Sequence, residues 1–186
     1  MPYSPLLAEL IPDERCCALG PGSPNKDLQP KLAALSLEQL FSGGPITDPN
    51  AARCCLSGLW LLHDFLDESH TISQEIETID GSYWHAIMHR REPDYGNSKY
   101  WFRRVGDHAV FSELLAKAKE LIAGEGAQDS VAHEIAQADR WDPYRFVDWC
   151  EQLARGRAQQ RTLAERIAQE EWRLLFTDCF VRAIWE

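Results

Sequence analysis

The chain has 186 residues, 45% hydrophobic and 26% charged, a composition typical of a globular domain with its own core. Its 29 acidic residues outnumber 19 lysines and arginines, and the net charge of −10 disfavours binding to nucleic acid or to an anionic membrane surface. No segment approaches the roughly 20 apolar residues of a membrane span, and the N-terminal residues lack a signal-peptide pattern, so we expect a soluble, cytoplasmic protein.

Residues 1–48 are predicted to form an irregular arm, because most of the ten prolines lie in the first fifty residues. Within the arm, Leu37, Leu40 and Phe41 recur at helical spacing behind Ser36, which predicts one short helix over 32–41. The apolar side of this helix needs a partner. We therefore expect the arm to pack on the remainder of the chain.

Residues 49–186 are predicted to form an all-α domain, because apolar residues recur at helical spacing and no sustained alternation of β-branched residues occurs. The expected fold is a single-domain bundle of helical hairpins. Asp142 is expected to cap a helix that has Pro143 at its first position. The other helices are predicted over 49–66, 69–79, 82–91, 97–105, 108–123, 130–138 and 159–184.

One segment carries a repeat-like pattern: Arg91 to Arg104 (REPDYGNSKYWFRR) resembles the turn and second helix of a tetratricopeptide repeat. No second copy follows at the 34-residue period of such arrays. The resemblance implies a helical hairpin at this place.

Histidines cluster between His63 and His108. At helical spacing His63, Asp67 and His70 lie within about 60° of one another, on a side rich in leucine. His85 and His89 add a pair four residues apart. Gly58, upstream of this cluster, would let a neighbouring helix approach closely.

A buried polar group without a partner costs roughly 1–3 kcal/mol, so these side chains need one. A divalent metal would satisfy them, with His63, Asp67, His70, His85 and His89 as ligands and Asp67 holding the imidazoles in register. His63, Asp67 and His70 are the candidate catalytic residues, since a histidine can act as a general base near neutral pH. The alternative is a hydrogen-bonded core network without metal.

Two metal-site patterns have partial counterparts here. His63-Asp64 on a predicted helix resembles the metal centre of HD-domain phosphohydrolases, which would imply metal-dependent hydrolysis of phosphate esters. That family also has an upstream histidine, whereas His63 is the first histidine of this chain. Asp67-x-x-His70 resembles the Glu-x-x-His motif of di-iron bundles, present in one copy.

The charge changes sign after the histidines: no lysine or arginine lies between Arg53 and Arg90, and five then follow within 15 residues. Arginine forks hold carboxylates and phosphates, so a small anionic ligand is expected. The alternative is that these cations pair with Asp64, Glu68, Glu75 and Glu77. The candidate ligand-binding residues are Arg90, Arg91, Lys99, Tyr100, Arg103 and Arg104.

Two functions follow from these features. The first is a pocket lined by His, Asp and Arg for a small anionic molecule, with metal-assisted hydrolysis or related chemistry. The second is a non-catalytic helical interaction module with a hydrogen-bonded polar core, in which Tyr100-Trp101-Phe102 anchors a protein partner. The chain has no Gly-x-Gly-x-x-Gly or Walker-type loop, which disfavours dinucleotide and P-loop nucleotide binding.

Overall fold

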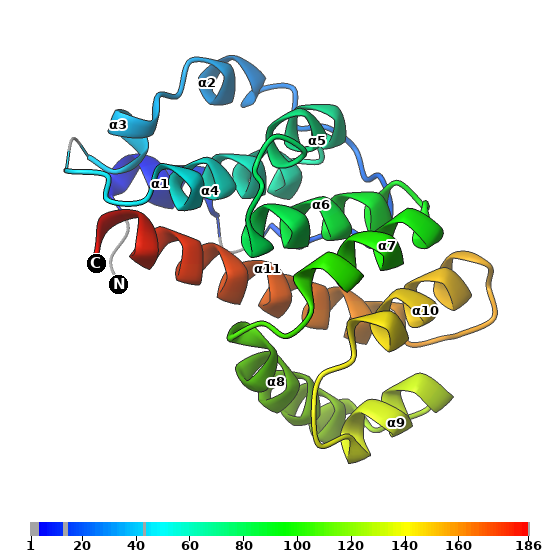
Figure 1. Cartoon of the computed structure of the whole chain (residues 1–186). Coiled ribbons are helices and arrows are strands. Elements are labelled where there is room, and N and C mark those ends of the chain that lie inside the picture. The colour runs from blue at the N-terminus through cyan, green and yellow to red at the C-terminus, as the bar shows by residue number, and fades with distance from the viewer. Residues whose placement is uncertain (1–3, 13–14, 43, 186) are drawn as a thin grey trace.

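The computed structural model describes residues 4–12, 15–42 and 44–185, and all regular secondary structure within these ranges is helical. The all-α prediction is confirmed. The helices are α1 (Pro5–Leu10), α2 (Gln29–Ala33), α3 (Leu37–Leu40), α4 (Pro49–Leu62), α5 (Leu66–Ser73), α6 (Ile79–Arg91), α7 (Tyr95–Val105), α8 (Val110–Glu125), α9 (Ser130–Gln137), α10 (Pro143–Ala154) and α11 (Arg161–Ile184) (Figure 1).

Helix α11 is the centre of the architecture: it packs against α4 on one side and α8 on the other (Figure 1). Trp172 of α11 stacks on Phe176 with ring centroids 4.8 Å apart and meets Trp84 of α6 edge to face at 6.2 Å. Next to this core, α5, α6 and α7 pack in sequence order. That order brings the polar side chains of three consecutive helices together.

At Gly58, α4 lies in close contact with side chains of α6 and α11. A Cβ added there would lie 2.8 Å from Cη2 of Trp84 and 3.3 Å from Phe176. The backbone oxygen of Gly58 also accepts a hydrogen bond of 2.8 Å from the indole of Trp172. The structure thus shows the close approach that the sequence predicts at this glycine.

Replacing Gly58 with alanine is expected to destabilise the protein by about 1–3 kcal/mol, because the extra methyl overpacks a ring that cannot move freely. Gly124 in α8 is the matched control, since a Cβ there meets nothing within 4 Å. Gly124→Ala should stabilise by roughly 0.5–1 kcal/mol through the higher helix propensity of alanine. Chemical denaturation measures both, and an equal response of the two variants would contradict the packing argument.

The described residues of the arm form three short helices, and the arm packs on the bundle through both apolar and polar contacts. Leu7, Leu10, Leu32 and Leu40 are buried in the same core as the long helices. Cys17 N donates to Gln169 Oε1 at 2.7 Å. This bond fixes the arm to α11, and the hydrogen bonds from Arg15 to the Leu62 oxygen and from Arg91 to the Gly20 oxygen fix it to α4 and α6.

The predicted helix over 32–41 is two helices in the structure, α2 and α3. Ser36 adopts an extended conformation, and its side chain accepts a hydrogen bond from Gln39 N in a capping box. A capping residue begins a new helix and cannot also continue an earlier one. The boundary at Ser36 was therefore visible in the sequence, whereas the earlier start of α2 was not.

The predicted helix over 49–66 is also interrupted. Helix α4 ends at Leu62, Asp64 has a left-handed φ of 64°, and α5 begins at Leu66. The Asp64 carboxylate accepts hydrogen bonds from Arg15 and Arg91, and from Ser23 N at 3.0 Å. Contacts from the arm and α6 thus favour a turn where helical periodicity alone predicts continuation.

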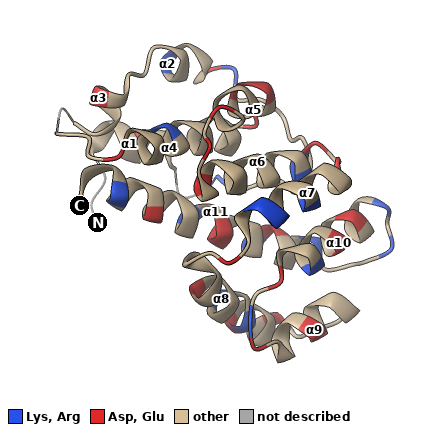
Figure 2. Ribbon diagram, viewed as in Figure 1, with Lys and Arg blue, Asp and Glu red and all other residues tan. Residues whose placement is uncertain are grey.

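Acidic and basic residues are interspersed along the helices, as Figure 2 shows. Within the described part of the chain, no helix has both the length and the apolar composition required to cross a membrane.

Candidate functional site

Three of the predicted site residues meet in one cluster, which we call the histidine cluster: His70, His85 and His89. Helix α5 carries the first, and α6 carries the other two on adjacent turns. The ring centroid of His70 lies 4.6 Å from that of His85 and 5.4 Å from that of His89. One ligand nitrogen from each residue lies within 4.8 Å of the others.

The two α6 imidazoles direct the same ring nitrogen toward each other. Nε2 of His85 and Nε2 of His89 are 3.0 Å apart. Two nitrogens on a tetrahedral zinc ion are about 3.3 Å apart, because each metal–nitrogen bond is about 2.0–2.1 Å long. The pair is therefore spaced almost as two metal ligands would be.

The opposite ring nitrogens are held by other side chains. Nδ1 of His85 lies 2.9 Å from the Ser73 hydroxyl, and Nδ1 of His89 lies 3.1 Å from the Glu92 carboxylate. Histidines that bind metals use their second nitrogen in this way, which fixes the tautomer and the ring orientation. The cluster has this outer layer of partners for two of its three rings.

These partners favour one arrangement of the ring protons. An ionised Glu92 only accepts hydrogen bonds, so Nδ1 of His89 carries the proton and Nε2 has a lone pair. Ser73 donates to the backbone oxygen of His70 at 3.3 Å, so its oxygen is free to accept from Nδ1 of His85. In this arrangement two lone pairs face each other across 3.0 Å, and a cation between them would remove the repulsion.

Burial and the neighbouring imidazoles His89 and His70 lower the pKa of His85 to about 3. Burial also lowers the pKa of His89, against the opposing effect of Glu92. Both rings are consequently neutral at physiological pH, which is the form that binds metals. At neutral pH a second proton therefore does not occupy the ring nitrogen that a metal ion would bind.

One edge of the histidine cluster reaches the surface. His70, Asn97 and Trp101 are half-buried, whereas His85 and His89 are buried. The Trp101 ring lies 4.2 Å from the ring of His85, and the side-chain nitrogen of Asn97 lies 3.0 Å from Nε2 of His89. An additional ligand would approach along this edge, between α5 and α7.

The structure places the other two predicted metal ligands, His63 and Asp67, elsewhere. His63 is the buried C-cap of α4, and its Nε2 lies 2.8 Å from the backbone oxygen of Leu10. Asp67 is exposed in the first turn of α5, at a shallow cleft of about 360 Å³ beside the arm. The turn between α4 and α5 separates His63 from His70, because helical spacing does not continue through it, whereas Asp67 shares α5 with His70 but is exposed to solvent.

The predicted ligand-binding residues also divide. Arg90 and Arg91 are buried and engaged inside the protein, by Glu171 and Asp64 respectively. The Lys99 ammonium of α7 pairs with the Asp148 carboxylate of α10 at 2.5 Å. Two of these three partners, Glu171 and Asp148, lie outside the acidic set expected from the sequence.

Tyr100, Arg103 and Arg104 are the exposed members of the set, and all three lie on α7. The Arg103 guanidinium lies over the Tyr100 ring at 5.6 Å, and that of Arg104 lies over Trp101 at 4.9 Å. Because Trp101 also contacts His85, Arg104 is connected to the histidine cluster through the Trp101 ring.

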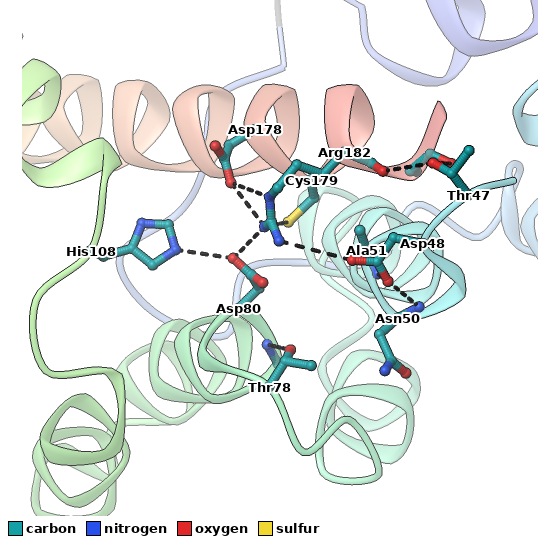
Figure 3. Close-up of polar contacts among 12 residues, drawn as sticks. Thr47, Asp48, Asn50, Ala51, Thr78, Asp80, His108, Asp178, Cys179 and Arg182 are labelled. Carbon is teal, nitrogen blue, oxygen red and sulfur yellow. Dashed lines mark hydrogen bonds and ion pairs between the residues drawn. The ribbon is translucent and has the colours of Figure 1, made fainter. Parts of the chain in front are cut away.

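A second group of potential ligands already holds a cation. Asp80, Asp178 and Cys179 lie close enough to share a metal ion, but the guanidinium of Arg182 occupies the space among them (Figure 3). Its Nη2 is 2.6 Å from Asp80 and 2.9 Å from Asp178. This group is an ion-pair network that connects α11 to α6.

Sequence reasoning did not identify Ser73, Glu92 or Asn97 as partners of the histidines. Glu92 was visible in principle, since it follows His89 by three residues and such pairs meet on a helix. The positions of Ser73 and Asn97 depend on how α5 and α7 pack against α6, which helical periodicity does not specify.

Comparisons with known proteins give no information about function, because no protein-family model, curated protein or solved structure matches this chain.

Proposed function

We propose that this protein binds a divalent transition metal through His70, His85 and His89 and uses it to hydrolyse a small anionic substrate. The observation that carries the proposal is the pair of facing Nε2 atoms, 3.0 Å apart, with both Nδ1 atoms held by Ser73 and Glu92. Three imidazole ligands with a fourth position open to solvent are the pattern of catalytic zinc sites.

Such a site supplies a nucleophile at neutral pH. A divalent ion held by His70, His85 and His89 would supply it, because coordination lowers the pKa of bound water to about 7 and would make that water available as a nucleophile toward an ester. The ion also attracts a substrate anion, because three neutral imidazoles leave its double charge uncompensated.

The competing function is an interaction module in which the histidines form a hydrogen-bonded core. It requires Ser73 to donate to Nδ1 of His85, so that Nε2 of His85 donates to Nε2 of His89. The exposed Tyr100, 45% accessible with Arg103 over its ring, is the feature that favours a partner surface. In that arrangement the 3.0 Å contact between the two Nε2 atoms is an ordinary hydrogen bond.

Metal titration of chelator-treated, untagged protein tests the proposal. We expect one equivalent of Zn²⁺ or Co²⁺ to bind, and a metal concentration 100 times the dissociation constant to stabilise the fold by about 2.7 kcal/mol. His85→Ala and His89→Ala should abolish both stoichiometric binding and the thermal shift.

His133→Ala is the matched control, because His133 lies on the exposed face of α9 with Gln137 as its partner. It should bind metal like the unmodified protein. Absence of stoichiometric binding in the unmodified protein would exclude the metal centre and leave the hydrogen-bonded core.

A further inference from the structure

Asn97 is held in place beside the histidine cluster by the turn between α6 and α7. Asp94 N donates to the backbone oxygen of His89 at 3.0 Å, and the Asp94 side chain accepts from Asn97 N at 3.1 Å. These two bonds connect the first turn of α7 to the last turn of α6. The position of Asn97 relative to His89 is therefore set by the backbone.

The Asn97 side chain has no acceptor other than a ring nitrogen of His89 among the contacts of the described residues. Its Nδ2 is 3.0 Å from Nε2 of His89 and 3.5 Å from Nδ1. An atom this close to both ring nitrogens lies over the face of the imidazole and out of line with the lone pair of Nε2, which stays available to a metal ion. The amide hydrogens therefore lack an acceptor lone pair in this contact, and an unpaired polar group costs free energy even when half-buried.

A metal ion on the in-plane lone pair of Nε2 and the Asn97 nitrogen over the ring face would lie on adjacent sides of the same ring atom. Asn97 also lies at the half-buried edge where a fourth ligand would enter, so an oxygen bound to the ion there would have the Asn97 amide beside it as a donor.

We propose that Asn97 is a substrate-binding residue that donates a hydrogen bond to an oxygen of a metal-bound oxyanion, such as a phosphate or carboxylate group. The proposal rests on the metal centre proposed above. Asn97 is suited to this role because its amide donates without titrating, and because a hydrogen bond to a charged acceptor is about twice as strong as a neutral one. The site would then select small oxyanions over neutral ligands of similar size.

Cobalt-loaded protein provides the test, with inorganic phosphate as the probe. Visible absorption of bound Co²⁺ reports the metal and its fourth ligand separately from any activity. We expect phosphate to shift this spectrum saturably in the unmodified protein. Asn97→Ala and the similarly sized Asn97→Leu should each weaken phosphate binding about tenfold, while Co²⁺ affinity stays within about twofold.

Asn50→Ala is the matched control, because Asn50 lies exposed in the first turn of α4. It should leave both affinities unchanged. Unchanged phosphate affinity in both cobalt-loaded Asn97 variants would overturn the role of Asn97 and leave the metal centre intact. A loss of Co²⁺ affinity as large as that of His70→Ala would make Asn97 a metal ligand and also overturn the proposal. Failure of the unmodified protein to bind Co²⁺ would instead remove the metal centre itself, and with it the oxyanion site.

Discussion

Replacing Glu171 with alanine is expected to lower the free energy of unfolding by about 3–5 kcal/mol, the cost of breaking a buried ion pair from one side. Glu171 of α11 is 0% exposed, and it pairs with Arg90, whose side chain is 2% exposed. It also accepts a hydrogen bond of 3.0 Å from the Tyr83 hydroxyl. Although burial acts in the opposite direction, the adjacent Glu171 raises the pKa of Arg90, so the guanidinium remains charged.

Glu170→Ala is the matched control, because Glu170 is the preceding residue of α11 and pairs with Arg173, whose side chain is 63% exposed. Exposed pairs of this kind contribute about 0–1 kcal/mol. Urea denaturation of both variants at neutral pH measures the difference. Similar destabilisation by the two variants would show that the Arg90–Glu171 pair contributes no more than a surface ion pair.

Local signals in the sequence were sufficient for most of the helices. Asp142 accepts from Tyr144 N at 2.9 Å with Pro143 at the first helical position, as the Asp-Pro pair predicts. Ser36 likewise caps α3. These signals succeed because each depends on residues within one turn of the helix end.

Features that depend on packing between distant segments were not predictable in this way. The turn at Asp64 is stabilised by Arg15 and Arg91, which lie 49 and 27 residues away in the sequence. A helical projection that runs through this turn groups His63 with His70, whereas the structure separates them. Asp67 shares α5 with His70 but is exposed and lies outside the histidine cluster. The pair His85 and His89, on one uninterrupted helix, kept the spacing that the projection gives.

The basic residues illustrate the same limit. A run of cations looks the same in the sequence whether the side chains face solvent or the interior. Arg90 and Arg91 are directed inward because Glu171 and Asp64, supplied by α11 and by the turn before α5, lie where their side chains end. Arg103 and Arg104 have no such carboxylate among the described residues, and they lie over aromatic rings at the surface.

Asp80→Asn is expected to destabilise the protein by about 2 kcal/mol at pH 5, through the network shown in Figure 3. The buried Asp80 carboxylate accepts from His108 at 3.0 Å and from Arg182 at 2.6 Å. Arg182 also contacts Asp178 at 2.9 Å and Asp48 at 4.0 Å, so it keeps other partners in the variant. The expected cost is therefore smaller than for Glu171, whose partner is fully enclosed.

The same variant has a defined pH dependence. Burial alone would raise the pKa of Asp80, but the hydrogen bonds from His108 and Arg182 outweigh it and hold the pKa below the ordinary value of 3.8. Because the folded state prefers the ionised carboxylate, the stabilisation by Asp80 is complete above pH 3.8 and is lost as the pH falls through the lower pKa of the folded protein. The difference in unfolding free energy between the unmodified protein and Asp80→Asn should accordingly shrink between pH 5 and pH 2, as measured by urea denaturation at each pH.

Asp178→Asn, at a carboxylate that is 29% exposed, is the control and should cost no more than about 1 kcal/mol at pH 5. A constant difference for Asp80→Asn down to pH 2 would mean that its carboxylate titrates alike in the folded and unfolded states, contrary to the contacts that surround it.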